Sequence, residues 1–284
     1  MKKIPPFVWT KELAIGIPFV DADHQVLVSL LNLVETCIDA REETFVLGSL
    51  LNALAEYTEH HFSREEKLQQ VCGYAGLQEH KTIHRRLACE VNAIGRRFET
   101  DPSSVETGEV KEFLRNWLVE HIMVHDFAYR QACVGHEQGA AAGEAIKLAN
   151  GGVVQSNVLQ LDRLRILVID DNPNFLRLVA TVLKAAGIRR VHTAGSAMKG
   201  LEWSIRQTAD VVLCDWLMRD MNGVDFALKM AEMELPSRVV LMSGCSADSF
   251  REQNVGSGVE GFLEKPISAG SLLNAVLNTP SGAA

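Results

Sequence analysis

Histidines and acidic residues in the first half of the chain recur at spacings that suit a metal site. Nine histidines occur among the 284 residues, and eight of them lie before residue 137. His61 and Glu65 are four residues apart, as are His80 and His84, so each pair would project from one face of a helix. Imidazoles and carboxylates together suit iron, because carboxylates can bridge two ions while imidazoles complete each coordination shell.

Three further residues extend this pattern to the flanking segments, namely His24, His121 and Asp126. A single histidine pair is more often an ordinary surface or core feature than a ligand set. Four successive segments that each contribute a piece are much harder to explain without a shared site. The spacing leaves two choices open, because His60 is adjacent to His61 and His125 stands four residues after His121.

Acidic residues in the second half of the chain follow short apolar runs. Asp170 and Asp171 come directly after the run at 166–169, and Asp215 ends the run that begins at residue 211. In an open parallel sheet, such carboxylates would meet beyond the carboxyl ends of the strands, where ligands bind. They would repel one another unless a hard divalent cation neutralised them, and Mg²⁺ is the usual ion. Two further runs are followed by a hydroxyl and an ammonium group, those of Ser243 and Lys265.

The elements that would position the histidines are helices. Up to residue 133, apolar residues recur at three- and four-residue spacings, with interruptions near residues 73–76 and 100–104. The pattern predicts four helices, at roughly 20–40, 43–71, 77–99 and 106–133. Short connections between long amphipathic helices favour an all-α up-down four-helix bundle.

From residue 163 the pattern changes to short, β-branched apolar runs that alternate with helical stretches. These runs predict five strands, at 166–169, 190–193, 211–213, 239–242 and 262–263. Nearly continuous apolar strands are typical of a parallel sheet covered by helices on both faces. We therefore expect an α/β doubly wound domain of the flavodoxin-like type.

The chain is thus expected to contain a helical domain over residues 1–135 and an α/β domain over residues 163–284. Residues 136–162 between them are small and poorly patterned, which predicts a flexible linker with at most a short helix around 144–149.

Composition narrows the class of protein. The net charge of −8 argues against a nucleic-acid surface, and no apolar run is long enough to span a bilayer. The amino end lacks the apolar stretch of a secretory signal. Six scattered cysteines are typical of free thiols in a reducing compartment. We expect a cytoplasmic protein without nucleic-acid or membrane partners.

Motifs throughout the first 135 residues resemble those of the bacteriohemerythrin family. They are Asp21-Ala-Asp-His24, His61-Phe-Ser-Arg-Glu65, Gly73-Tyr74, His80-Lys-Thr-Ile-His84 and Trp117-Leu-Val-Glu-His121-Ile-Met-Val-His-Asp126. Trp9 and the pair Gly16-Ile17 also resemble the N-terminal arm of the family. The resemblance implies a bundle that holds two iron ions, bridged by an oxo or hydroxo group, with O2 as ligand.

The same resemblance assigns a role to each position. One iron would be held by His80, His84 and His121. The other would be held by His24 and His61, which leaves a position open for oxygen. The bridging carboxylates would be Glu65 and Asp126, so the resemblance selects His61 over His60 and Asp126 over His125. An apolar oxygen pocket, which favours reversible binding over turnover, would include Trp117, Leu118 and Ile122.

The ordered set Asp-Asp, Asp, Ser and Lys-Pro at strand ends resembles the response-regulator receiver domain over roughly residues 163–280. The resemblance implies that Asp215 accepts a phosphoryl group, with Lys265 and Ser243 contacting its oxygens. The Mg²⁺ ligands would be Asp170, Asp171, Asp215 and the backbone carbonyl of Leu217. Phe262 would be the aromatic switch that couples phosphorylation to a surface of the domain.

Four features depart from the two family patterns. Gln69 stands where bacteriohemerythrins usually have Met, Ala75 follows Gly-Tyr where Pro is common, and Arg219 stands where receivers often have Pro. In the receiver-like half, the sequence of residues 248–258 predicts a weakly helical, glycine-bearing fourth helix.

These resemblances together predict a two-component signalling protein in which a di-iron oxygen or redox sensor is coupled to a receiver. A histidine kinase or phosphotransfer protein would supply the phosphoryl group. Because the sequence ends soon after the last receiver helix, output would pass to a downstream protein or back across the linker to the helical bundle. We do not expect an enzyme, apart from the receiver's own phosphorylation and dephosphorylation. The alternatives are an oxygen carrier or store regulated or localised by its receiver, and a di-iron enzyme acting on peroxide or nitric oxide.

Overall fold

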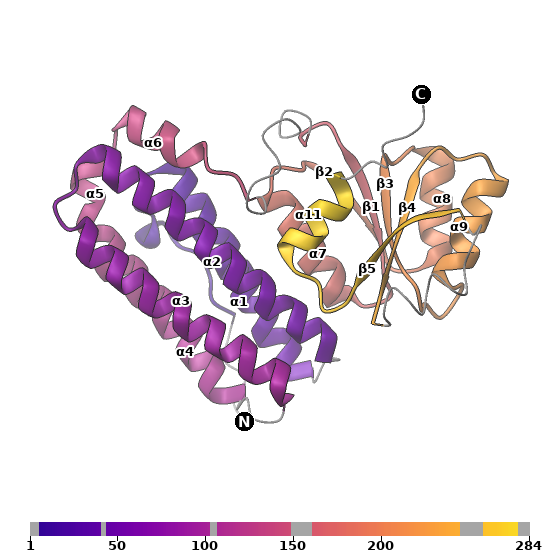
Figure 1. Cartoon of the computed structure of the whole chain (residues 1–284), viewed down its shortest axis with the longest axis horizontal. Helices are drawn as coiled ribbons and strands as arrows, with labels where there is room; N and C mark the ends of the chain where they lie inside the picture. The colour runs from indigo at the N-terminus through magenta and orange to yellow at the C-terminus, as the bar shows by residue number, and fades with distance from the viewer. Residues whose placement is uncertain (1–5, 41–43, 103–106, 149–160, 245–257, 278–284) are drawn as a thin grey trace. The chain divides into compact units, whose positions relative to one another are not determined.

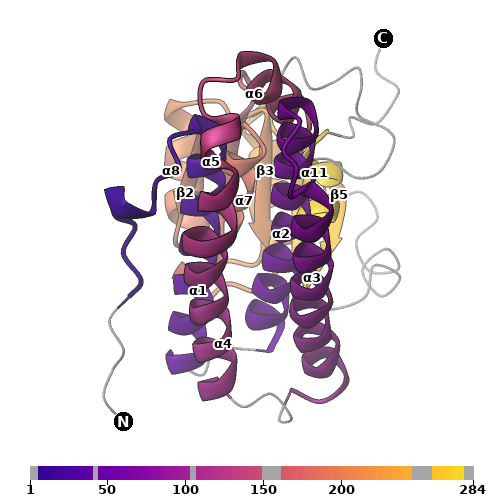
Figure 2. The same ribbon diagram turned by 90° about the vertical axis from the view of Figure 1, so that its left-hand side faces the viewer.

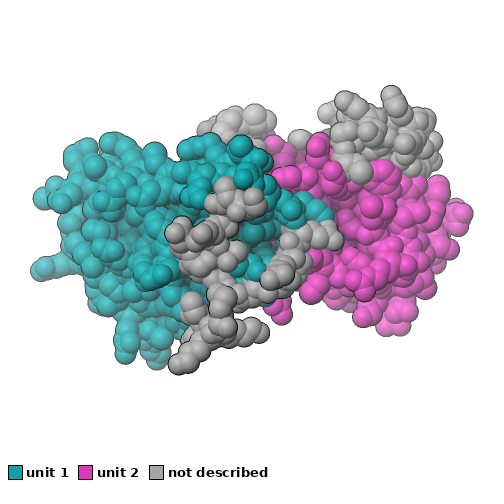
Figure 3. Space-filling view, turned by 90° about the horizontal axis from the view of Figure 1, so that it is seen from below, with its two compact units in different colours: residues 1–148 teal, residues 149–284 magenta. Residues whose placement is uncertain are grey.

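The chain divides into two compact units, residues 1–148 and residues 149–284 (Figure 3). The computed structural model describes residues 6–40, 44–102, 107–148, 161–244 and 258–277. None of the helices within these ranges is both long and apolar enough to cross a membrane.

The first unit is a four-helix bundle, as predicted. Its long helices are α1 (Pro18–Ala40), α2 (Thr44–Cys72), α3 (Leu77–Thr100) and α4 (Thr107–Glu120). They lie side by side in both ribbon views (Figures 1 and 2). The apolar positions of each helix face inward, and residues such as Leu30, Leu54 and Leu118 are at most 1% exposed. Burial of these side chains supplies most of the driving force for the bundle.

The fourth helix changes its geometry at the residues selected as ligands. After α4, residues His121–Asp126 form a π-helical turn, and α5 (Phe127–Cys133) continues as a regular helix. A π-helix bonds residue i to residue i+5 and so contains an extra residue per turn. Residues five apart therefore share a face here.

Two short segments flank the bundle. In the N-terminal arm, the backbone N–H groups of Ile15 and Gly16 donate to the carboxylate of Asp21, at 2.7 and 3.0 Å. At the other end, α6 (Glu137–Glu144) packs along α2. The structure therefore contradicts a flexible linker that begins at residue 136. The helix expected near 144–149 lies instead at 137–144, and residues 149–160 of the expected linker lie outside the described residues.

The second unit is a parallel five-stranded sheet, as predicted. Its strands are β1 (Arg165–Ile169), β2 (Arg190–Ala194), β3 (Val211–Asp215), β4 (Arg238–Ser243) and β5 (Val259–Glu264). Their order is β2-β1-β3-β4-β5, the doubly wound order of flavodoxin-like folds. The central strand β3 is buried throughout, which explains its continuous apolar run.

Helices cover both faces of the sheet (Figure 1). One face carries α7 (Pro173–Ala185) and α11 (Ala269–Leu277), and the other carries α8 (Ala197–Arg206) and α9 (Gly223–Glu232). Of the weakly helical fourth receiver helix expected at 248–258, all but Gly258 lies outside the described residues. The strand order places the carboxyl ends of β1 and β3 beside each other, which positions the acidic residues that follow them.

Candidate metal and phosphorylation sites

Seven histidine and carboxylate side chains meet in the interior of the bundle. They form two groups, within each of which the potential ligand atoms lie within 4.8 Å of one another. One group comprises Glu65, His80, His84, His121 and Asp126, and the other comprises His24, His61, Glu65 and Asp126. Only the two carboxylates belong to both groups, which is the arrangement of two adjacent ion sites with shared carboxylates. The structure thus brings together all seven residues selected from the sequence, each at most 3% exposed.

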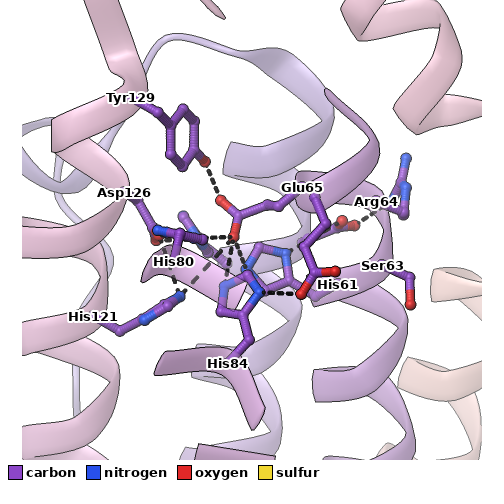
Figure 4. Close-up of polar contacts among 12 residues, drawn as sticks. His61, Ser63, Arg64, Glu65, His80, His84, His121, Asp126 and Tyr129 are labelled. Atoms are coloured by element: carbon purple, nitrogen blue, oxygen red, sulfur yellow. Dashed lines mark hydrogen bonds and ion pairs between the residues drawn. The ribbon is translucent and has the colours of Figure 1, made fainter. Parts of the chain in front are cut away.

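The Oε2 atom of Glu65 lies at the centre of this cluster (Figure 4). It is 3.3 Å from Nε2 of His84, 3.5 Å from Nε2 of His80 and 3.6 Å from Nε2 of His61. Ligands bound at about 2.1 Å to one ion lie about 3–4 Å apart. The imidazole of His121 is the fourth near this oxygen, at 3.9 Å. Most of these distances are too long for hydrogen bonds, but they are expected between ligands of the same metal ion.

Many ligand atoms of the cluster are buried without a hydrogen-bond partner in the described part of the chain. They are both ring nitrogens of His24, His61 and His121, Nε2 of His80 and of His84, Oε2 of Glu65 and both carboxylate oxygens of Asp126. Buried polar atoms in folded proteins are almost always paired. A set of imidazole and carboxylate atoms left unpaired around one point fits a pair of metal ions, and iron accepts both ligand types.

The negative charge of the cluster is divided unevenly between its two carboxylates. Burial opposes ionisation of Glu65, but the charge of His61 and the closeness of the other imidazoles hold its pKa well below the usual range. Burial and the charge of Glu65 raise the pKa of Asp126 well above the usual range. Burial also lowers the pKa of His24, and that of His121 to about 3. These two rings are therefore neutral at pH 7, as metal coordination requires.

The structure separates the neighbouring candidates that spacing alone left open. His61 is fully buried in the cluster, whereas His60 is half-buried and packs beside Tyr57, with ring centroids 5.7 Å apart. Asp126 is fully buried, whereas His125 is half-buried and outside both ligand groups. The π-helical turn explains the second result, because it brings residue i+5 rather than i+4 onto the face of His121.

Three residues without a role in the sequence analysis contact the ligands. Oε1 of Glu66 lies 3.0 Å from Nδ1 of His84, and Oδ2 of Asp23 lies 3.6 Å from Nδ1 of His61. The hydroxyl of Tyr129 donates to Oε1 of Glu65 (Figure 4). Asp23 and Glu66 are each adjacent in sequence to a ligand, which was the only available signal.

Gln69, the residue found where Met is usual, is fully buried in α2. Neither atom of its amide has a hydrogen-bond partner among the described residues, and nothing in the structure explains this.

The residues expected to form an oxygen pocket are buried beside the cluster. Trp117 stacks on His121 with ring planes 12° apart, and Leu118 and Ile122 are at most 1% exposed. Trp117 and His121 also line a surface pocket of about 400 Å³ between α3 and α4. Its walls include charged residues such as Arg86 and Glu112, so this pocket is not purely apolar. Through His121 it borders the ligand group that contains His80, His84 and His121.

A second acidic site lies at the edge of the sheet in the second unit. Carboxylate oxygens of Asp170, Asp171 and Asp215 lie within 4.8 Å of one another. Nζ of Lys265 lies 2.8 Å from Oδ2 of Asp170 and 2.8 Å from Oδ1 of Asp215. Burial raises the pKa of Asp215 to about 6; the charge of Lys265 opposes this rise, and the charges of Asp170 and Asp171 add to it. A carboxylate cluster that opposes its own ionisation fits a divalent cation such as Mg²⁺.

The remaining residues expected at this edge are placed as follows. Ser243 is buried at the end of β4, where its carbonyl accepts the backbone N–H of Lys265 at 2.6 Å. Leu217 follows Asp215 by two residues, with its side chain 71% exposed. Phe262 is half-buried and packs against the hydrophobic core that includes residues of β3, β4 and α9. Arg219, a departure from the receiver pattern, pairs through Nε with Oδ2 of Asp171 at 3.3 Å.

Both units match known protein families. Residues 15–133 match the family model of the hemerythrin HHE cation binding domain, and residues 166–277 match that of the response regulator receiver domain. Bacteriohemerythrin from Stenotrophomonas maltophilia is 28% identical over 49% of this chain and 95% of its own length. Bacteriohemerythrin from Pseudomonas paraeruginosa is 30% identical over 44% of this chain and 80% of its own length.

The second unit has relatives of its own. The probable transcriptional regulatory protein NarL of Mycobacterium tuberculosis is 32% identical over 43% of this chain, which spans 57% of that protein. The first half of the chain therefore belongs to the bacteriohemerythrin family, and a response regulator receiver domain follows it in the same polypeptide.

Proposed function

We propose that this chain is a two-component signalling protein in which a di-iron site in the bundle and a phosphorylatable aspartate in the receiver influence each other. The observation that carries the proposal is that both ligand sets are complete in one chain: seven buried ligands around two shared carboxylates, and three carboxylates beside a buried lysine.

The bundle residues would divide between two iron ions. His80, His84 and His121 would hold one ion, His24 and His61 would hold the other, and Glu65 and Asp126 would bridge them. Bound iron would supply reversible oxygen binding and a change of oxidation state. With the ring nitrogens that face the cluster bound to metal, Glu66 and Asp23 would accept the remaining ring protons of His84 and His61. Trp117, Leu118 and Ile122 would limit the access of water.

The receiver residues would perform phosphoryl transfer. A carboxylate oxygen of Asp215 would attack the phosphorus of a phosphohistidine or acyl phosphate, and the leaving group would depart with the bonding electron pair. Mg²⁺, held by Asp170, Asp171, Asp215 and the carbonyl of Leu217, would offset charge on the phosphoryl oxygens. Lys265 already contacts Asp215 and would pair with those oxygens, and Ser243 would hydrogen-bond one of them.

The surrounding signalling steps follow from this assignment. The phosphodonor would be a histidine kinase or a phosphotransfer protein, and the receiver would catalyse its own phosphorylation and dephosphorylation. Phe262, between the core and the surface, would couple phosphorylation to a downstream protein. A cytoplasmic location fits the free thiols of the five described cysteines.

The assignment is tested by measuring iron content and phosphorylation on the same preparation. After anaerobic loading with ferrous iron, two irons per chain are expected, with loss of iron in His84→Ala. With acetyl phosphate and Mg²⁺, one phosphoryl group per chain is expected, and none in Asp215→Asn. A chain that binds no iron, or that is phosphorylated equally without Asp215, would contradict the assignment.

A further inference from the structure

The imidazole of His61 faces the metal cluster with one nitrogen and a buried carboxylate with the other. Its Nε2 lies 3.6 Å from Oε2 of Glu65, and its Nδ1 lies 3.6 Å from Oδ2 of Asp23. Asp23 is only 2% exposed, and neither its Oδ2 nor Nδ1 of His61 has a hydrogen-bond partner among the described residues. When Nε2 binds a metal ion, Nδ1 must carry the proton, and Asp23 is the acceptor in front of it.

The other oxygen of Asp23 is fixed by two donors. The hydroxyl of Tyr57 donates to Oδ1 at 2.9 Å, and a terminal nitrogen of Arg64 donates to the same atom at 2.5 Å. Because α1 carries Asp23 and α2 carries Tyr57, His61 and Arg64, this network ties the two helices together behind the cluster. Rotation of the Asp23 carboxylate is therefore restricted to one orientation, which keeps Oδ2 directed at His61.

Arg64 extends the network to α6. Its Nε donates to the carbonyl of Gly143 at 3.3 Å, and its guanidinium lies 4.6 Å from the ring centre of Phe19. Gly143 is packed so closely that an added Cβ would lie 2.5 Å from Cζ of Phe19 and 3.0 Å from the carbonyl oxygen of Arg64. A single guanidinium thus bonds to both Asp23 and the last turn of α6, as only a planar side chain with several donors can.

We propose that Asp23 is the positioning residue of His61, and that Arg64 makes this positioning depend on the placement of α6. The inference rests on the proposed di-iron function and adds a route for its regulation. Helix α6 ends at Glu144, close to the end of the first unit at residue 148, so a shift of α6 would reach the metal site through two side chains. Conversely, occupation of the site would stabilise α6.

The other imidazole with a facing carboxylate provides a matched control. Glu66 lies 3.0 Å from Nδ1 of His84, and its described ion pair on the far side is with Lys81 of α3 at 3.7 Å. Glu66→Gln therefore removes an equivalent carboxylate from a ligand without changing the contact of Arg64 with α6.

The test uses the full chain loaded anaerobically with ferrous iron. It measures iron affinity by chelator competition, the midpoint potential of the iron, and amide hydrogen exchange in α6. Asp23→Asn should lower iron affinity roughly 10–100-fold, the range typical of residues that orient metal ligands. It should also raise the potential, because a less basic His61 stabilises ferric iron less well.

Two variants test the link to α6. Arg64→Lys keeps the charge beside Asp23 but cannot bond to both groups, so iron loading should no longer slow exchange in α6. Gly143→Ala should displace α6. It should also shift the midpoint potential of the iron in the same direction as Arg64→Lys shifts it. Glu66→Gln should weaken iron binding and leave the exchange response of α6 intact.

The outcomes separate the inference from the function on which it rests. Wild-type affinity and potential in Asp23→Asn would overturn the positioning role. An α6 that still responds to iron in Arg64→Lys, or that never responds in the wild type, would overturn the link. In each of these cases, the proposed function is still supported if the wild-type chain binds two irons. A wild-type chain that holds no iron would overturn both.

Discussion

Glu65 and Asp126 are both fully buried and both shared between the two ligand groups, yet their electrostatic surroundings differ. Imidazoles lower the pKa of Glu65, whereas burial and the charge of Glu65 raise that of Asp126. Without metal, the bundle therefore holds one carboxylate charge more readily than two. Metal ions supply the positive charge that lets both carboxylates ionise. Iron binding is accordingly expected to release protons.

The distinction between Asp126 and His125 gives a direct test at the residue scale. Asp126→Asn removes one shared carboxylate and should reduce iron content from two ions per chain to one or none. His125→Gln, one residue away but outside both groups, should retain two ions. Iron per chain, measured after anaerobic loading and desalting, checks both variants. Equal retention of iron by the two variants would contradict the assignment of Asp126.

The raised pKa of Asp215 predicts a pH dependence of stability in the absence of divalent cations. The folded group has a pKa of about 6 against an ordinary value of 3.8, so the folded state holds an extra proton between these values. The contribution of this group is fully present below about pH 4 and is lost as the pH rises through about 6. Its upper limit is about 3 kcal/mol, from about 1.4 kcal/mol per pKa unit.

Comparison of wild type with Asp215→Asn isolates this effect. In chelator, the free energy of unfolding of wild type relative to the variant should fall between pH 4 and pH 6. Mg²⁺ should raise the stability of wild type at pH 7 more than that of the variant. Urea unfolding over this pH range provides the measurement, and a difference that does not change with pH would refute the prediction.

At the scale of elements, the sequence predicts the regular helices and strands from their apolar periodicity. It does not predict where a helix departs from that periodicity. The apolar spacing gave four bundle helices and five strands close to their observed bounds. The π-helical turn of His121–Asp126 carries no such signal, so spacing rules left His125 open as an alternative, and only the family motif selected Asp126. The position of helix α6 was not predicted, for a different reason. It contacts α2 through glycines, Gly139 and Gly143, where an added Cβ would lie under 3 Å from neighbouring side chains. A helix that packs through glycine has no apolar stripe to detect.

The π-helical turn can be tested by removing its extra residue. Deletion of Val124, whose side chain is 56% exposed, should restore a regular α-helix in which Asp126 stands four residues after His121 and still shares its face. The deletion variant should therefore keep two ions per chain, as should the matched control Val124→Ala. Loss of iron by the deletion variant alone would contradict this account of the turn.

For the whole molecule, each ligand set is complete within its own compact unit. No residue of the receiver is needed to build the described metal cluster, and no residue of the bundle is needed for the carboxylates around Lys265. Either site could therefore work without the other. The sequence motifs were sufficient to select the side chains that the structure brings together in each unit, because each of those side chains belongs to a family motif. They did not identify Asp23, Arg64 and Tyr129, whose roles depend on tertiary contacts.

Coupling between the units is the central claim and is tested most directly by one rate. The rate is that of Asp215 phosphorylation by acetyl phosphate with Mg²⁺, compared between anaerobic diferrous protein and its oxygenated and diferric forms. We predict a difference of about fivefold or more, the lower end of typical couplings between sites, and its loss in His61→Ala. Equal rates in all iron states would contradict the account and leave an oxygen carrier with an independent receiver as the better description.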